Sequence, residues 1–207
     1  VLDLGCGYGS GICNIVKHFG SKGTAVDISP ANIELAKNRA RETGVDEKIE
    51  FIQADIKDMD LSDKKYDLIL AEGGILSFIG RSFGLNLCRD LVKPGGRVSF
   101  SDLILLGDDS PDEVLDIFQN EIYHYETEDT YRKLLNEYSY NIELMALVPP
   151  SGWDNYYAHM SRRLEDSQGF FAEKNVKNVF YKEIDIFYRH KGSRYIGYLY
   201  GVVEKED

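Results

Sequence analysis

The chain has 207 residues, of which 43% are apolar and 29% charged, and its formal net charge is −11 at pH 7. This composition is typical of a folded globular protein and excludes a disordered chain. The negative charge and the lack of a long basic run argue against a nucleic-acid partner, because phosphate contacts dominate that affinity, and against an anionic membrane surface.

No signal peptide and no apolar stretch long enough to span a bilayer are visible, so we expect a cytoplasmic protein that does not enter a membrane. The three cysteines, Cys6, Cys13 and Cys88, lack metal-ligand spacing, and their odd number does not suggest a disulfide framework. We therefore expect no metal site. The sequence begins with Val1 inside a strand pattern, and we expect an N-terminal segment to precede it.

The first half alternates strand and helix patterns. We predict strands at 1–4, 23–28, 49–53, 66–71 and 98–103, and helices at 10–19, 29–43 and 83–92. Ser29 is the expected N-cap of the second helix, with Pro30 at its first position and Gly44 at its end. The segment 93–96, Lys-Pro-Gly-Gly, is predicted to be a turn. Apolar strands alternating with helices indicate a parallel sheet that is covered on both faces.

The second half is mostly helical. We predict helices at 111–119 and 127–138, a strand at 141–147, helical structure over 153–188 broken near Gly169, and a last strand at 195–203. We expect one α/β domain over residues 1–207, with a helical insertion before the sixth strand.

The most informative feature is the segment 1–11, Val-Leu-Asp-Leu-Gly-Cys-Gly-Tyr-Gly-Ser-Gly. A tight strand-to-helix turn needs one glycine, whereas four glycines in seven residues indicate a loop whose backbone approaches a ligand. The spacing does not fit the Gly-x-Gly-x-x-Gly motif of dinucleotide folds, because Ser10 or Ile12 stands where the third glycine belongs. No Walker lysine follows the loop either.

Residues 2–9 resemble the first motif of class I S-adenosylmethionine-dependent methyltransferases. Four further segments resemble that family in order and spacing, namely 25–29, 52–56, 66–73 and 91–98. The resemblance covers about residues 1–105 and the last strand. It implies a Rossmann-like, doubly wound, mostly parallel seven-stranded sheet with helices on both faces. Residues 1–105 would form the cofactor-binding half, 106–190 a helical cap and substrate region, and 194–203 the last strand.

The resemblance also implies the cofactor, S-adenosyl-L-methionine, and its product, S-adenosyl-L-homocysteine. The glycine loop would approach the methionine part and the ribose, Asp27 would accept the ribose hydroxyls, and Asp55 would accept the adenine amino group. The residues carried over as cofactor-binding are Asp3, Gly5, Cys6, Gly7, Gly9, Asp27, Ile28, Ala54, Asp55, Ile56 and Glu72. Alternatively, Asp27 is only an acid at the start of a helix, Asp55 is only an acid in a loop, and Glu72 has no role in the site.

The segment Ala71-Glu72-Gly73-Gly74 lacks the Asn/Asp-Pro-Pro-aromatic signature of enzymes that methylate amino groups of bases or glutamine. We therefore expect a small-molecule acceptor, as in the branch that includes quinone-biosynthesis enzymes. The candidate catalytic residues are Glu72, His124 and His159, and the candidate substrate residues are Tyr123, Trp153 and Tyr157. Alternatively, these aromatic residues pack the helical cap, and the histidines are surface or capping residues.

Two functions stay open at this point. The first is methyl transfer by in-line displacement, and the second is a non-catalytic regulatory module that binds S-adenosylmethionine. A nicotinamide oxidoreductase is a third, less supported reading. The expected oligomeric state is a monomer or a homodimer.

Overall fold

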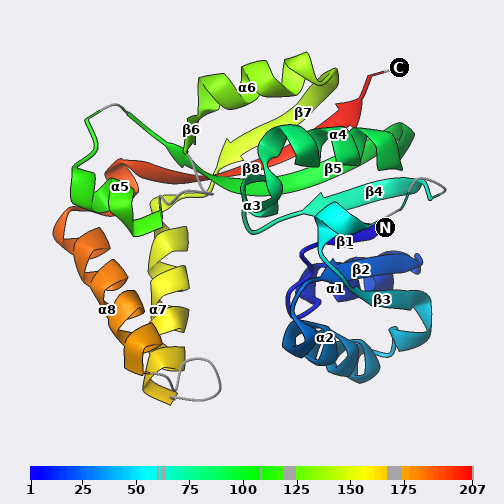
Figure 1. Cartoon of the computed structure of the whole chain (residues 1–207), viewed down its shortest axis with the longest axis horizontal. Helices are drawn as coiled ribbons and strands as arrows, with labels where there is room; N and C mark the ends of the chain where they lie inside the picture. Colours follow the sequence, from blue (N-terminus) through cyan, green and yellow to red (C-terminus); the bar gives the residue numbers. More distant parts are fainter. Residues whose placement is uncertain (60, 62–63, 108, 119–124, 167–173, 207) are drawn as a thin grey trace. The chain divides into compact units, whose positions relative to one another are not determined.

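The structure is a computed structural model that describes residues 1–59, 61, 64–107, 109–118, 125–166 and 174–206 (Figure 1). Its strands are β1 Leu2–Leu4, β2 Gly23–Asp27, β3 Ile49–Gln53, β4 Tyr66–Ala71, β5 Val92–Leu105, β6 Glu126–Thr127, β7 Tyr140–Leu147 and β8 Ile196–Lys205. Its α-helices are α1 Ser10–Phe19, α2 Pro30–Thr43, α3 Ile75–Ile79, α4 Arg81–Leu91, α5 Asp112–Phe118, α6 Glu128–Glu137, α7 Pro150–Asp166 and α8 Lys174–Arg189. None of the described helices is both long and apolar enough to cross a membrane.

Eight strands of the described residues form one sheet in the order β3-β2-β1-β4-β5-β8-β7, and the short β6 pairs with β5 beside this path. The pairs β2–β3, β1–β2, β1–β4 and β4–β5 are parallel, which confirms the predicted α/β sheet. The chain runs outward from β1 to β3 and returns to place β4 on the other side of β1. The strand order therefore reverses between β1 and β4, and open α/β sheets bind ligands beyond the carboxyl ends of the strands at this point.

Local sequence signals explain the helix that follows β2. The Ser29 hydroxyl caps α2 by accepting a hydrogen bond from the Asn32 amide (3.3 Å), and Pro30 occupies the first turn. Gly44 ends the helix in a left-handed conformation (φ 72°). These three positions are confirmed, and each has the residue type that its conformation favours.

The segment 93–96 is not the separate turn that the sequence suggested. It lies within β5 as a bulge, because Tyr66 of β4 pairs with Val92 while Leu68, two residues on, already pairs with Arg97. Gly95 takes a φ of 69° there, which explains the glycine. The short α3 and β6 were not predicted, because five and two residues are too few to show a periodic pattern.

The described chain divides into two compact units. The first comprises 1–102, 131–145 and 200–207, and the second comprises 103–130 and 146–199. In the first unit, α1 and α2 pack on β2 and β3 through a buried cluster that includes Ile12, Val16, Ala25 and Ala36. The second unit has its own core, in which α7 and α8 lie side by side (Figure 1) and the Trp153 and Phe187 rings are 4.9 Å apart. The helical region predicted at 106–190 thus differs from the observed second unit, since 131–145 belong to the first.

Candidate active site

The glycine loop follows β1 and uses its three odd-numbered glycines for different purposes. Gly5, Gly7 and Gly9 have φ values of 68°, 52° and 72°, a region that other residues rarely adopt. A Cβ on Gly5 would lie 2.9 Å from the Ile75 side chain, and one on Gly9 would lie 2.9 Å from the Ala36 Cβ. A Cβ on Gly7 would meet nothing within 4 Å. Packing therefore requires the outer two glycines, whereas Gly7 leaves open space above its backbone that a ligand can fill.

Asp27, at the end of β2, ties this loop to α2. Its carboxylate is buried; Oδ2 accepts a hydrogen bond from the Gly7 amide (2.8 Å), and Oδ1 accepts from the Ser29 amide (2.9 Å) and the Asn32 side chain (3.1 Å). Ile28, the next residue, is 65% exposed. Asn32 was missed by the sequence analysis, because a polar residue in the first turn of a helix carries no specific signal.

The end of β3 lies beside the end of β2. The Ala54 amide donates to the Asp27 carbonyl (3.2 Å), and the Asp55 carboxylate accepts from the Lys57 amide (2.9 Å), capping the short helix Ile56–Asp58. Asp55 is half-buried and Ile56 is buried. The structure therefore brings the predicted ribose and adenine residues together at neighbouring strand ends.

Asp3 lies on β1, beneath the loop. Burial raises its pKa from 3.8 to about 7, the negative charges of Glu72 and Asp27 add to that effect, and the Ile12 amide opposes it. Burial also raises the pKa of the Cys6 thiol to about 12, with Asp3 and Asp27 contributing. Cys6 is therefore a neutral packing residue at pH 7 and not a nucleophile.

Glu72 directly follows β4, and two hydroxyl groups hold its carboxylate. Oε1 accepts hydrogen bonds from the Tyr200 hydroxyl (2.7 Å) and from the Ser99 hydroxyl (3.3 Å), and these two hydroxyls lie 2.9 Å apart. Burial is the main cause of a raised pKa at Tyr200. Ser99 and Tyr200 were not predicted as site residues, since 101 residues separate them and neither belongs to a motif.

The loop after Glu72 is attached to β5. The Gly73 amide donates to the Ser101 hydroxyl and the Gly74 amide to the Ser101 carbonyl, both at 2.9 Å. Gly73 and Gly74 have φ values of 74° and 77°, so both need glycine. Ser99 and Ser101 are two residues apart and therefore share one face of β5.

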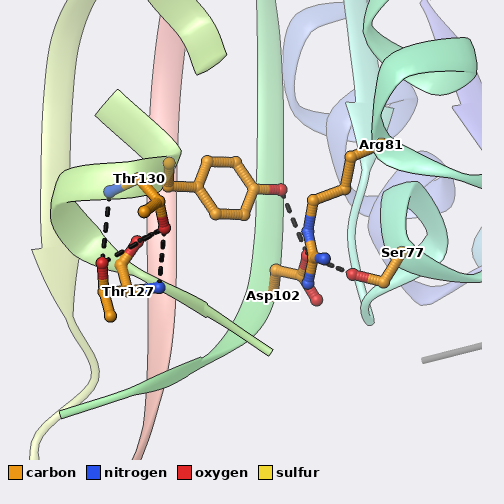
Figure 2. A network of polar contacts seen from close by, with 6 residues as sticks. Ser77, Arg81, Asp102, Thr127 and Thr130 are labelled. Atoms are coloured by element: carbon orange, nitrogen blue, oxygen red, sulfur yellow. Dashed lines mark hydrogen bonds and ion pairs between the residues drawn. The ribbon is translucent and has the colours of Figure 1, made fainter. Parts of the chain in front are cut away.

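The other face of β5 carries a buried polar network centred on Asp102 (Figure 2). Asp102 is fully buried, and its Oδ2 accepts from the Ser77 hydroxyl, from Arg81 Nε (3.0 Å) and from the Tyr131 hydroxyl (3.1 Å). Tyr131 also stacks on Phe100, with ring centroids 5.2 Å apart. Burial and the Asp102 charge raise the pKa of Tyr131, so this tyrosine stays a hydrogen-bond donor. The network joins α3, α4 and α6 to β5.

A pair of threonines begins α6 in the same view. The Thr130 hydroxyl accepts from the Thr127 amide (2.9 Å), and the Thr127 hydroxyl accepts from the Thr130 amide (3.2 Å). This reciprocal cap satisfies amides at the start of the helix that carries Tyr131.

The predicted acceptor residues belong to the second unit or lie outside the described residues. Trp153 (7% exposed) and Tyr157 (1%) pack in the second unit's core, where the Tyr157 and Phe187 rings are 4.8 Å apart. These are the packing contacts that the sequence left open as an alternative. His159 is exposed, and its Nδ1 lies 3.4 Å from Arg162 Nη2. Tyr123 and His124 lie outside the described residues.

Two further observations concern where a ligand could bind. A hollow lined by residues including Val1, Gly23, Glu50 and Tyr66 opens at the amino ends of the strands, which is the edge opposite the glycine loop. Ligands of this fold class bind at the carboxyl ends, so we do not assign that hollow to the site. Among the described residues, no group of three His, Cys, Asp or Glu side chains could hold a metal ion.

The comparisons with known proteins agree with this geometry. Residues 1–96 match a family model described as "Methyltransferase domain". The match covers 96 of the 207 residues. Its fold is that of a S-adenosyl-L-methionine-dependent methyltransferase from Geobacter sulfurreducens, solved with S-adenosyl-L-homocysteine, with a TM-score of 0.81, 24% identity, and coverage of 99% of this chain and 84% of that one.

A sarcosine/dimethylglycine N-methyltransferase from Halorhodospira halochloris is 27% identical over 82% of this chain, which spans 61% of that relative. The [4+2]-cyclase SpnF shares the fold with a TM-score of 0.77 and 16% identity, over 99% of this chain and 74% of that one. The solved structures thus identify the fold. Since folds host several reactions, the reaction itself has to be argued from the site.

Proposed function

We propose that the protein transfers a methyl group from S-adenosyl-L-methionine to a small-molecule acceptor. The observation that carries this proposal is the open space above Gly7, whose amide is bonded to the carboxylate of Asp27. A backbone without side chains, next to an acid at the end of a strand, leaves room for a ribose and for the amino-acid part of the cofactor.

The predicted cofactor residues each have a role in the proposal. The glycine loop and Asp3 would hold the amino-acid end, and Asp27 would accept the ribose hydroxyls. The adenine would lie against Ile28, Ala54, Asp55 and Ile56. When bound, S-adenosylmethionine supplies an electrophilic methyl group on a sulfonium. The chain's own contribution is to orient the acceptor and to exclude water, which can be worth about 7–11 kcal/mol.

The charge and the composition support a small acceptor in the cytoplasm. With a net charge of −11, the chain is poorly suited to nucleic acid. The described cysteines are free and buried, which fits a reducing compartment. A monomer or homodimer remains our expectation for the oligomeric state.

The alternative is a module that binds the cofactor without turnover. Titration calorimetry with S-adenosylmethionine and S-adenosylhomocysteine tests binding, with Asp27→Ala as the probe and the exposed Asp46→Ala as its matched control. We expect Asp27→Ala to weaken binding about tenfold or more and Asp46→Ala to leave it unchanged. If neither compound binds the wild-type chain, both functions are wrong.

A methyl-transfer screen then separates the two functions. The assay follows the release of S-adenosylhomocysteine over a set of small acceptors. Turnover with any acceptor supports the enzyme. Tight binding with no turnover across the set favours the regulatory module.

A further inference from the structure

The Glu72 carboxylate has one oxygen in use and one available. The Tyr200 hydroxyl lies 2.7 Å from Oε1 and donates to it, whereas the single proton of the Ser99 hydroxyl can go either to Oε1 (3.3 Å) or to the Tyr200 oxygen (2.9 Å). Within the described part of the chain, no hydrogen bond reaches Oε2. These contacts hold Oε1 in place, and they leave Oε2 as an acceptor for a ligand.

Glu72 stands beside a second carboxyl group at the switch point of the sheet. After burial, the negative charge of Glu72 is the main cause of the raised pKa of Asp3, and the charge of Asp27 also raises it. The carboxyl groups of Asp3 on β1, Asp27 at the end of β2 and Glu72 after β4 are therefore close enough for their charges to interact. Such a group of acids disfavours a phenolate or thiolate nucleophile and attracts ammonium groups.

We propose that Glu72 binds an amine acceptor, with an N–H group of the amine donating to Oε2, and that Ser99 and Tyr200 are positioning residues that fix Glu72. This inference rests on the proposed function, because the amine must lie beside the bound cofactor. A charge-assisted N–H···O bond is about twice as strong as a neutral one. An ammonium group has no lone pair, so it would first have to give a proton to a carboxylate such as Glu72, and the neutral amine is then the nucleophile. A hydroxyl acceptor would instead form an anion beside carboxylates as it lost its proton.

The first experiment compares matched ligands by calorimetry on the chain saturated with S-adenosylhomocysteine. Sarcosine has an N–H group where methoxyacetate has an ether oxygen. Ethanolamine has an amino group where ethylene glycol has a hydroxyl group. We expect an amine to bind about tenfold or more tightly than its oxygen partner, and Glu72→Gln to remove that difference. Equal binding within both pairs would overturn the inference.

The second experiment asks which acceptor class is methylated. The same chain is screened with amines, phenols, thiols and carbon acids, and S-adenosylhomocysteine release is measured. We expect release with amines. Methylation of a phenol, thiol or carbon acid without any amine would overturn the inference, and so would cofactor binding without any transfer.

The third experiment separates positioning from structure. With the best amine, Tyr200→Phe and Ser99→Ala should each lower kcat/KM about five- to tenfold, while the Kd for S-adenosylmethionine stays within about twofold. Ser99→Thr keeps the hydroxyl and should recover most of the loss. Tyr66→Phe is the matched control. It also removes a tyrosine hydroxyl, which donates to the Thr24 hydroxyl (3.3 Å), but at the end of β4 that lies away from Glu72.

The Ser99 pair keeps the inference testable if Tyr200→Phe does not fold. Wild-type kcat/KM in both Tyr200→Phe and Ser99→Ala would overturn the positioning role, as would an equal loss in Ser99→Thr and Ser99→Ala. If the wild-type chain binds neither S-adenosylmethionine nor S-adenosylhomocysteine, the proposed function fails. Intact cofactor binding with a non-amine acceptor contradicts only this inference.

Discussion

Replacing Asp3 by asparagine removes a titratable group from beneath the glycine loop and keeps the shape of the side chain. Asp3 is 5% exposed, and its pKa rises from 3.8 to about 7 on folding, chiefly through burial. The folded chain therefore binds this proton more tightly than the unfolded chain does. The stability that comes from the neutral carboxyl is full below about pH 4 and is lost as the pH rises to about 7.

The size of the effect follows from the same values. The difference between about 7 and 3.8 is about 3 pKa units, and each unit corresponds to 1.36 kcal/mol, which gives an upper limit of about 4 kcal/mol. At pH 8 we expect Asp3→Asn to be more stable than the wild type by about 2–4 kcal/mol. Near pH 4 the two free energies of unfolding should agree within about 1 kcal/mol. The substitution should also weaken S-adenosylmethionine binding about tenfold, because a negative charge is lost from the site.

Urea unfolding followed by circular dichroism, between pH 4 and pH 8, measures the difference between the two chains. Asp46→Asn is the control, because Asp46 is exposed and its substitution changes the net charge by the same amount as Asp3→Asn. A difference between Asp3→Asn and wild type that is constant across this pH range would refute the reasoning. Unchanged affinity in calorimetry would remove Asp3 from the cofactor site.

Four other substitutions test single features of the first unit. Gly9→Ala should lower the free energy of unfolding by about 2 kcal/mol or more, because its Cβ would lie 2.9 Å from Ala36. Gly7→Ala should cost about 1–2 kcal/mol but weaken S-adenosylmethionine binding more than tenfold, and normal binding in calorimetry would show that the open space is not the ligand's. Arg81→Met should cost about 3–5 kcal/mol in urea unfolding, because it leaves the Asp102 charge buried without its cation; a loss below about 1 kcal/mol would contradict that role. Ser29→Ala should cost about 1 kcal/mol through loss of the α2 cap, and an unchanged melting temperature would argue against the cap.

The first half of the fold and the contact between the glycine loop and Asp27 could be predicted from sequence because their signals are local. The glycine loop, the cap at Ser29 and the acid at Asp27 each combine a residue type with a fixed spacing, and the structure places Asp27 against Gly7. The bulge at 93–96 also had a local signal, but Pro-Gly-Gly fits a turn as well as a bulge. Only the pairing with β4 decides between them.

The residues that hold Glu72 could not be predicted in the same way. Ser99 and Tyr200 meet Glu72 only through the sheet order, and Asp102 meets Tyr131 in the same manner. A serine or an aspartate inside an apolar strand does signal a buried polar partner, yet the sequence does not name that partner. The aromatic residue Trp153 had the opposite problem, since a packed core and a ligand wall use the same side chains.

The second unit is built from two separate stretches of chain, 103–130 and 146–199, and contains neither terminus. The backbone passes between the units after residues 102, 130, 145 and 199, and these points fall within β5, α6, β7 and β8. No truncation from either end can delete the second unit and spare the first. A chimera that exchanges it with a relative's counterpart must replace both stretches together, because Val114 of one stretch and Trp153 of the other share a single core.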